Sequence, residues 1–302
     1  MIYKRSNIKT KKYLASKVQK QFWLLQQFRP DSPAYNVPAL FKVEGQIDIR
    51  VLNKCVNEMI LEYDTLRTRF VNEKGELYQV ILPEQYIEIE VIDLQNKSKI
   101  NDSTDKYRIL EKLAAKPFNM YTEPLIRISL VKNSYKEFFI LFVMHHSISD
   151  LESLSIFLQE LAEKYNDMSL TGKMPERSKK KQYIEYAKWQ NNWVNCDEIK
   201  QKLEFWNEEL KSQSGYLKLP INHEREGNQT DRGGEYRTII EEEINNKIIE
   251  YSSQKKVSTF ATMLSAFYCL LAFYSKQNDI IVGIPFANRL QKSAKKNPRL
   301  FR

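Results

Sequence analysis

Hydrophobic positions along this chain follow three different spacings. Residues 37–43 carry hydrophobic side chains at every second position, which predicts a strand with one buried face, ended by Gly45. Residues 138–144 are apolar without interruption, which is typical of a strand buried on both faces. Residues 151–165 carry leucines and a tyrosine three or four positions apart, which predicts an amphipathic helix. The chain therefore combines sheet and helix.

The same criteria predict the remaining elements. Ser16 and Gln19 are spaced as a capping box that begins a helix, and Asp48 can cap a second one. Helices and strands alternate irregularly, which predicts an α+β fold with a mixed sheet. Further helices are expected at 105–115, 183–210 and 258–271, and further strands at 77–82, 87–92, 126–132, 236–242 and 280–284.

A polar, basic segment at residues 171–182 interrupts the periodic pattern. It contains Gly172 and Pro175, which are typical of a connection between structural units. With 302 residues the chain is longer than an average domain, so two units are expected. We predict that residues 1–172 form the first unit and residues 173–302 belong to the second.

The composition is that of a folded protein with an excess of basic residues. Hydrophobic residues make up 42% of the chain and aromatic residues 12%, enough to form a core. The 47 Lys and Arg against 38 Asp and Glu give a net charge of +9, which favours an acidic partner. The basic residues are interleaved with acidic ones, and no motif for reading nucleic acid accompanies them. No nucleic-acid partner is expected.

The cysteines and the short apolar runs indicate the cellular compartment. Cys55, Cys196 and Cys269 are far apart and in no paired spacing, which favours reduced thiols over disulfides or a zinc site. Residues 1–12 are polar and basic, unlike a secretory signal. The longest apolar run, residues 138–144, is too short to span a membrane. We therefore expect a cytoplasmic protein without membrane contact.

One short segment has a composition that a catalytic role would explain best. Residues 144–150 read Met-His-His-Ser-Ile-Ser-Asp and contain two of the three histidines of the chain, where an apolar strand gives way to a helix. Imidazoles there are costly to desolvate without hydrogen-bond partners. With an ordinary pKa of about 6.5, a neutral His146 can accept a proton from an attacking amine or hydroxyl group. Asp150 can fix the local geometry through an ion pair.

Two simpler interpretations of this segment stay open. The histidines can be a buried pair that only bonds to the backbone. A metal site made of His145, His146 and Asp150 is less favoured, because adjacent residues of a strand point to opposite faces. For the same reason, only one of the two histidines can face a given cleft. The chain contains no G-x-S-x-G, P-loop, H-E-x-x-H or dinucleotide-binding pattern.

The segment also resembles a known family. His145-His146-x-x-x-Asp150 resembles the HHxxxDG signature of nonribosomal peptide synthetase condensation domains, and other stretches are similar to further motifs of that family in the same order over residues 13–289. These are Ser16-x-x-Gln19-x-Gln21-Phe22-Trp23 (S-x-A-Q-x-R-L-W), Glu62–Phe70 (R-H-E-x-L-R-T-x-F), Tyr183–Gln190 (Y-x-D-F/Y-A-x-W-Q), Val282–Arg289 and the early turn Pro33–Pro38.

Some positions depart from the family pattern. Leu151 replaces the glycine after the aspartate, Glu152 replaces an aromatic residue, and Glu62 and Tyr63 replace an Arg-His pair. If the glycine position needs a positive φ or a close approach of the substrate, Leu151 costs about a kcal/mol or more and narrows the substrate tunnel that the family fold implies. The later family motifs are absent up to Arg302, so we expect a C-terminally truncated domain.

The resemblance implies a fold and a reaction. The fold would consist of two chloramphenicol-acetyltransferase-like subdomains in a V, the second incomplete, with residues 1–172 carrying the HHxxxD motif. The reaction would be amide formation between a donor acyl or peptidyl thioester and the amine of an aminoacyl group. Both substrates would be held on the phosphopantetheine of carrier domains, with an adenylation domain in the same assembly line and no cofactor bound directly by this chain.

The resemblance also implies roles for single residues. His146 would orient or deprotonate the amine, and His145 would support it from the other side of the strand. Asp150 would be structural, paired with Arg289 or, as a second choice, with Arg67. Two alternatives remain: a stand-alone acyltransferase of the same superfamily, and a catalytically silent platform that recruits a partner.

Overall fold

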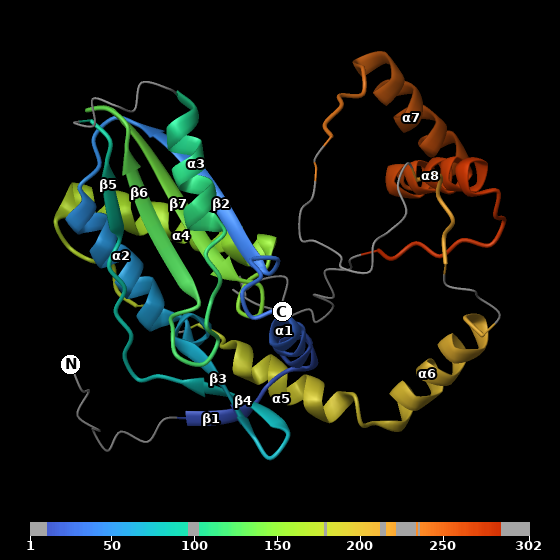
Figure 1. Ribbon diagram of the computed structural model, residues 1–302, viewed down its shortest axis with the longest axis horizontal. Helices are drawn as coiled ribbons and strands as arrows, with labels where there is room; N and C mark the ends of the chain where they lie inside the picture. Colours follow the sequence, from blue (N-terminus) through green and yellow to red (C-terminus); the bar gives the residue numbers. More distant parts are fainter. Residues whose placement is uncertain are drawn as a thin grey trace. The chain divides into compact units, whose positions relative to one another are not determined.

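The computed structural model describes residues 11–95, 103–177, 180–211, 216–221, 234 and 236–284 (Figure 1). Contacts divide these residues into two compact units, one ending at Ile199 and one within Lys200–Phe286. This division follows contacts alone. The subdomain boundary predicted at residue 172 stays a prediction.

A four-stranded sheet forms the centre of the first unit. Its order is β2 (Asn36–Glu44), β7 (Glu137–His145), β6 (Ile126–Lys132) and β5 (Glu90–Asp93). The first three strands are antiparallel to their neighbours, and β5 runs parallel to β6. Every residue of β7 after Glu137 is buried. The uninterrupted apolar run therefore forms an interior strand, as predicted.

Helices cover both faces of this sheet (Figure 1). On one face, α2 (Ile49–Glu62) packs against α4 (Leu151–Thr171), and the rings of Phe142 and Phe157 meet at 6.0 Å between centroids. On the other face lies α3 (Ser103–Ala114), whose Tyr107 approaches Phe139 at 6.1 Å. Phe139 and Phe142 are three positions apart on β7, so their side chains point to opposite faces. The unit thus has a helix–sheet–helix core.

A second, three-stranded sheet has the order β1 (Lys11–Leu14), β4 (Glu76–Ile81) and β3 (Thr68–Glu73). Next to β1 the chain enters α1 (Lys17–Phe28), which begins with the predicted capping box of Ser16 and Gln19.

Helix α5 (Tyr183–Trp193) packs on this region. The hydroxyl of Tyr183 lies 2.7 Å from that of Ser16, and the backbone N–H of Lys17 donates to Gln190 at 2.9 Å. Residues predicted to begin the second subdomain therefore pack on the start of α1.

Three helices lie at or beyond the end of the first unit: α6 (Asp197–Glu209), α7 (Glu242–Lys255) and α8 (Thr259–Ser275). Ser258 caps α8 as the sequence predicts, and its hydroxyl accepts from the N–H of Ala261. No single helix in the described ranges is long and apolar enough to cross a membrane. Helices α7 and α8 meet that criterion only together, as a pair bent by 105°.

Residues 183–210 are almost entirely helical, as predicted, and form α5 and α6 separated by residues 194–196. Two predictions for this region were wrong. Residues 236–241 and 280–284 are irregular and not strands. Tyr236 and Ile239 are more than 90% exposed, and no described strand pairs with either segment. A hydrophobic segment forms a strand only where a neighbouring strand can pair with its backbone N–H and C=O groups.

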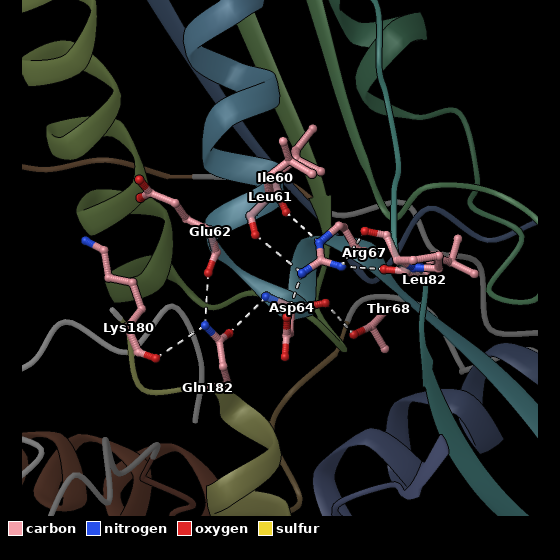
Figure 2. A network of polar contacts seen from close by, with 10 residues as sticks. Ile60, Leu61, Glu62, Asp64, Arg67, Thr68, Leu82, Lys180 and Gln182 are labelled. Atoms are coloured by element: carbon pink, nitrogen blue, oxygen red, sulfur yellow. Dashed lines mark hydrogen bonds and ion pairs between the residues drawn. The ribbon is translucent and has the colours of Figure 1, made fainter. Parts of the chain in front are cut away.

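Arg67 organises the end of α2 (Figure 2). Its guanidinium donates to the carbonyls of Ile60, Leu61, Leu82 and Pro83 and forms an ion pair with Asp64 at 2.7 Å. Because the Arg67 side chain is 11% exposed, these bonds compensate a charge that is largely shielded from water.

Gln182 joins the same turn to the segment that enters α5 (Figure 2). Its side-chain amide donates to the carbonyl of Glu62 at 2.9 Å and accepts from the N–H of Asp64 at 2.9 Å. One side chain thereby links segments 120 residues apart in sequence.

Glu62 and Tyr63, which depart from the family motif, lie beside this turn and bind α4. The carboxylate of Glu62 forms an ion pair with Lys164 at 2.8 Å, and both side chains are nearly or fully buried. The hydroxyl of Tyr63 donates to Glu160 at 2.6 Å, and Glu160 also pairs with Lys180 at 2.6 Å. Burial, and then the bond to Glu160, raise the pKa of Tyr63 well above its ordinary value.

The Glu62–Lys164 pair gives a first prediction. Lys164→Met should lower the free energy of unfolding by about 3–5 kcal/mol, because it leaves the Glu62 carboxylate buried without its partner. The double variant Glu62→Gln/Lys164→Met should lose less than the sum of the two single variants. Urea denaturation of the chain measures both.

Lys42→Met is the matched control. Lys42 pairs with Glu44 and Glu137 at the surface, where water screens the charges, so its loss should lower the free energy of unfolding far less than the loss of Lys164. Equal losses for Lys164→Met and Lys42→Met would contradict the proposed importance of the buried pair.

Candidate active site

The two histidines lie in a tight turn between β7 and α4. The backbone N–H of His145 donates to the carbonyl of Leu125 at 2.9 Å, and that of His146 donates to Tyr35 at 2.8 Å. The N–H of Ile148 then closes the turn on the carbonyl of His145 at 3.0 Å. The main chain at both histidines is therefore fixed by its neighbours, which is what a precisely placed side chain requires.

His145 points into the core. It is 1% exposed, and the rings of Phe118 and Tyr35 approach its ring edge-on at 6.1 and 6.4 Å. Its Nδ1 accepts from the backbone N–H of Ser147 at 3.1 Å and lies 2.8 Å from the Ser147 hydroxyl. Its Nε2 faces Gln26 Oε1 at 3.5 Å. Since Nδ1 accepts a backbone N–H, the single proton of the neutral ring belongs on Nε2.

The pKa of His145 is lowered from 6.5 to about 4, chiefly by burial and to a smaller extent by the neighbouring His146. A charged imidazolium is unfavourable where water cannot reach it. His145 is therefore neutral at physiological pH and acts as a fixed hydrogen-bonding group.

His146 points the other way and is exposed. Its ring stacks on Phe22 of α1 with centroids 4.6 Å apart, and its Nδ1 donates to the carbonyl of Ser149 at 2.8 Å. A carbonyl only accepts, so the neutral ring carries its proton on Nδ1 and presents the lone pair of Nε2. This arrangement leaves one basic nitrogen, in a fixed orientation, at the surface of the turn.

Asp150 caps α4. Its Oδ1 accepts from the N–H of Ser153 at 2.8 Å and from the Ser153 hydroxyl, so its position is set by the helix that it begins. Leu151 is the first residue of α4, has no positive φ and is 78% exposed. The strain expected from replacing glycine at this position is absent, because a helical residue needs no glycine.

The two arginines proposed as partners of Asp150 have different outcomes. Arg289 lies outside the described residues, so that pairing stays a prediction. Arg67 pairs with Asp64 and with backbone carbonyls at the end of α2, and the second-choice pairing with Asp150 is not found. The tight turn after α2 supplies enough acceptors close to the guanidinium to hold it there.

Sequence reasoning missed the groups that hold the histidine rings: Phe22, Gln26, Ser147 and the carbonyl of Ser149. Only Ser147 carried a local signal, because a serine two residues after a histidine can bond back to it. Gln26 and Phe118 also form part of the wall of a cavity of about 430 Å3 between the end of α1 and the segment before β6. Within the described ranges, no cluster of three His, Cys, Asp or Glu side chains could hold a metal ion.

Comparison with known proteins relates the sequence of this chain to a family. The Condensation domain family model matches residues 9–300. One linear gramicidin synthase protein of Brevibacillus parabrevis is 35% identical over 275 residues, which cover 90% of this chain and 4% of that protein. Surfactin synthase subunit 1 of Bacillus subtilis (strain 168) is 31% identical over 279 residues, covering 92% and 7%. The chain thus spans a small part of these relatives.

Solved structures show the same fold. A four-domain nonribosomal peptide synthetase solved with AMP and glycine matches with a TM-score of 0.82 at 21% identity, over 98% of this chain and 22% of that one. The starter condensation domain of rhizomide synthetase matches with a TM-score of 0.59 at 22% identity, over 68% of this chain and 51% of that one. At these identities the likeness concerns the fold alone.

The lowered pKa of His145 gives a second prediction. Below pH 6.5 the unfolded chain takes up a proton at His145, whereas the folded chain resists protonation down to about pH 4. Stability contributed by the neutral ring should therefore be lost as the pH falls from about 6.5 to about 4, on the order of 3 kcal/mol in all. Denaturant unfolding at pH 7 and pH 4.5 measures this loss.

His145→Gln is the comparison, since a glutamine has no such titration. Its unfolding free energy should fall less between the two pH values, the remaining loss coming from carboxylates elsewhere. Parallel pH dependences for the two proteins would mean that His145 is not held neutral.

Proposed function

The chain belongs to the condensation-domain family, and on this premise we propose that it catalyses amide bond formation between two thioester-bound substrates. The donor is an acyl or peptidyl thioester, and the acceptor is an aminoacyl thioester whose amine attacks the donor carbonyl carbon. The carbon–nitrogen bond forms, the carbon–sulfur bond breaks, and the amine loses one proton while the departing sulfur gains one.

The observation that carries this proposal is the orientation and hydrogen bonding of the His146 ring. Its Nδ1–H is used by the carbonyl of Ser149, and its plane is held by Phe22, so Nε2 is left as an oriented acceptor. Such a nitrogen can accept the proton of the attacking amine and return it to the departing sulfur. It can equally hold the amine in place and stabilise the charge of the tetrahedral intermediate. Both roles need the same neutral ring.

His145 and Asp150 act on the frame that carries His146. We assign His145 the role of a neutral support inside the core, and Asp150 that of the cap that fixes the start of α4. Neither residue would touch the substrate. In this proposal Arg289 remains the candidate partner of Asp150.

The substrates would arrive on partner proteins. We infer that both thioesters are carried on the phosphopantetheine of carrier domains, and that an adenylation domain of the same assembly line loads them. The net charge of +9 favours encounter with acidic carriers, mainly by raising the association rate. A cytoplasmic location fits this chemistry.

The alternatives have less support. A stand-alone acyltransferase of the same superfamily would use the same nitrogen with a free alcohol or amine as acceptor. A silent recruitment platform drew its support partly from Leu151. Since Leu151 begins α4 without a positive φ, backbone strain no longer supports that alternative.

The test uses carrier domains loaded through phosphopantetheine with a panel of acyl donors and aminoacyl acceptors, and mass spectrometry detects the amide product. His146→Ala should lower the rate of amide formation by about 10²-fold or more, the range of lost general-base catalysis. Leu151→Ala, an exposed change close by, should leave the rate unchanged.

His145→Ala should act mainly by lowering stability, which thermal unfolding separates from a loss of rate. Wild-type product formation by folded His146→Ala protein would remove His146 from the mechanism. Product formed only with free acceptors, and never with a carrier-bound acceptor, would favour the stand-alone acyltransferase.

A further inference from the structure

We propose that Gln26 of α1 is a positioning residue, which fixes the ring of His145 and, through it, the turn that presents His146. Its importance for the reaction rests on the proposed function of His146. Its effect on the two imidazole rings does not, and can be measured without substrate.

Gln26 is 4% exposed at the last turn of α1. Its amide nitrogen donates to the carbonyl of Pro30 at 2.8 Å, with longer contacts of 3.4 Å to the carbonyls of Arg29 and Ser32. All three groups are acceptors, so the NH2 end of the amide must face them. The oxygen end is thereby directed at His145, and the orientation of the amide is determined by the chain that follows α1.

The ring of His145 is consequently held from both ends. Its Nδ1 accepts from the N–H of Ser147, and its Nε2 faces the Gln26 oxygen at 3.5 Å, the long end of a hydrogen bond. Both contacts require the same tautomer, with the proton on Nε2. Because the ring is buried, losing either partner would leave a polar nitrogen unsatisfied, which is costly in the core.

Helix α1 holds both histidines with one face. Phe22 and Gln26 are four residues apart, so their side chains lie one above the other on the helix. Phe22 stacks on the ring of His146, and Gln26 faces the ring of His145. The strand end and the helix are thus joined at two consecutive residues of the turn, and a shift of His145 alters the support of its neighbour.

The coupling between the two rings runs through the turn itself. The hydroxyl and N–H of Ser147 contact the His145 ring, while the carbonyl of Ser149 accepts from His146. Ser147 and Ser149 are both buried, so neither can move far without disturbing the core. A loosened His145 therefore changes the direction in which His146 Nε2 points.

The experiment compares Gln26→Met with the wild-type chain. Methionine keeps the volume of the side chain, which also lines the cavity between the end of α1 and the segment before β6, but removes both the donor and the acceptor. Gln27→Met is the matched control: Gln27 is the next residue, is exposed, and accepts from the hydroxyl of Tyr121 at 3.0 Å. Protein labelled with 15N-histidine gives nitrogen spectra of three imidazoles at pH 7.

In the wild type and in Gln27→Met, His145 should show one fixed tautomer, with the proton on Nε2. In Gln26→Met the Nε2–H of His145 has no acceptor, so the Nε2 shift should move and the ring signals should broaden, while the N–H of Ser147 keeps the proton on Nε2. The signals of His146 should move or broaden in the same variant. Amide formation, in the carrier assay described above, should fall about 10- to 100-fold, as expected when a reacting group is misplaced.

Wild-type nitrogen shifts and line widths of His145 in folded Gln26→Met would overturn the proposal, and so would altered His145 signals with an unchanged His146 signal. If Gln26→Met does not fold, Gln26→Asn replaces it, because asparagine keeps an amide but is too short to reach both groups. A wild-type chain that forms no amide would refute the proposed function, while the nitrogen spectra would still decide the role of Gln26.

Discussion

The last residue of the central strand β7, His145, has a buried imidazole ring. Much of the surrounding geometry serves to give this ring its hydrogen-bond partners. His145 cannot hold a charge in the core, so it needs an acceptor for its one proton and a donor for its other nitrogen. The backbone of Ser147 supplies the donor, which forces the chain to turn back at once after the strand. Because adjacent residues of a strand point to opposite sides, the same turn directs His146 outward.

Charged side chains are buried at the end of α2, whereas the histidine turn buries a neutral ring. Arg67 holds the end of α2 through an ion pair with Asp64 and bonds to backbone carbonyls (Figure 2). The ion pair of Glu62 with Lys164 joins α2 to α4. The histidine turn is built from neutral hydrogen bonds. The direction in which His146 presents Nε2 therefore depends on these local bonds.

The sequence was most informative where a signal is local. The apolar run of β7, the caps Ser16, Asp48 and Ser258, and the histidine pair all follow from neighbouring residues. Gln26 could not be identified in this way, because its partner His145 lies 119 positions away and a glutamine in a helix has no distinctive pattern. The strands predicted at 236–242 and 280–284 failed because hydrophobicity does not reveal whether a partner strand is present.

The packing of α5 has a practical consequence for recombining such domains. The polar segment 173–182 is an attractive joint by composition, but the helix that follows it is part of the first unit's core, with Tyr183 and Ala187 buried. A chimera joined within that segment would bring in a foreign α5 and leave Ser16 and Lys17 facing side chains selected for another surface. A crossover placed after residue 195 keeps the native pairing and transfers α6 with whatever follows it.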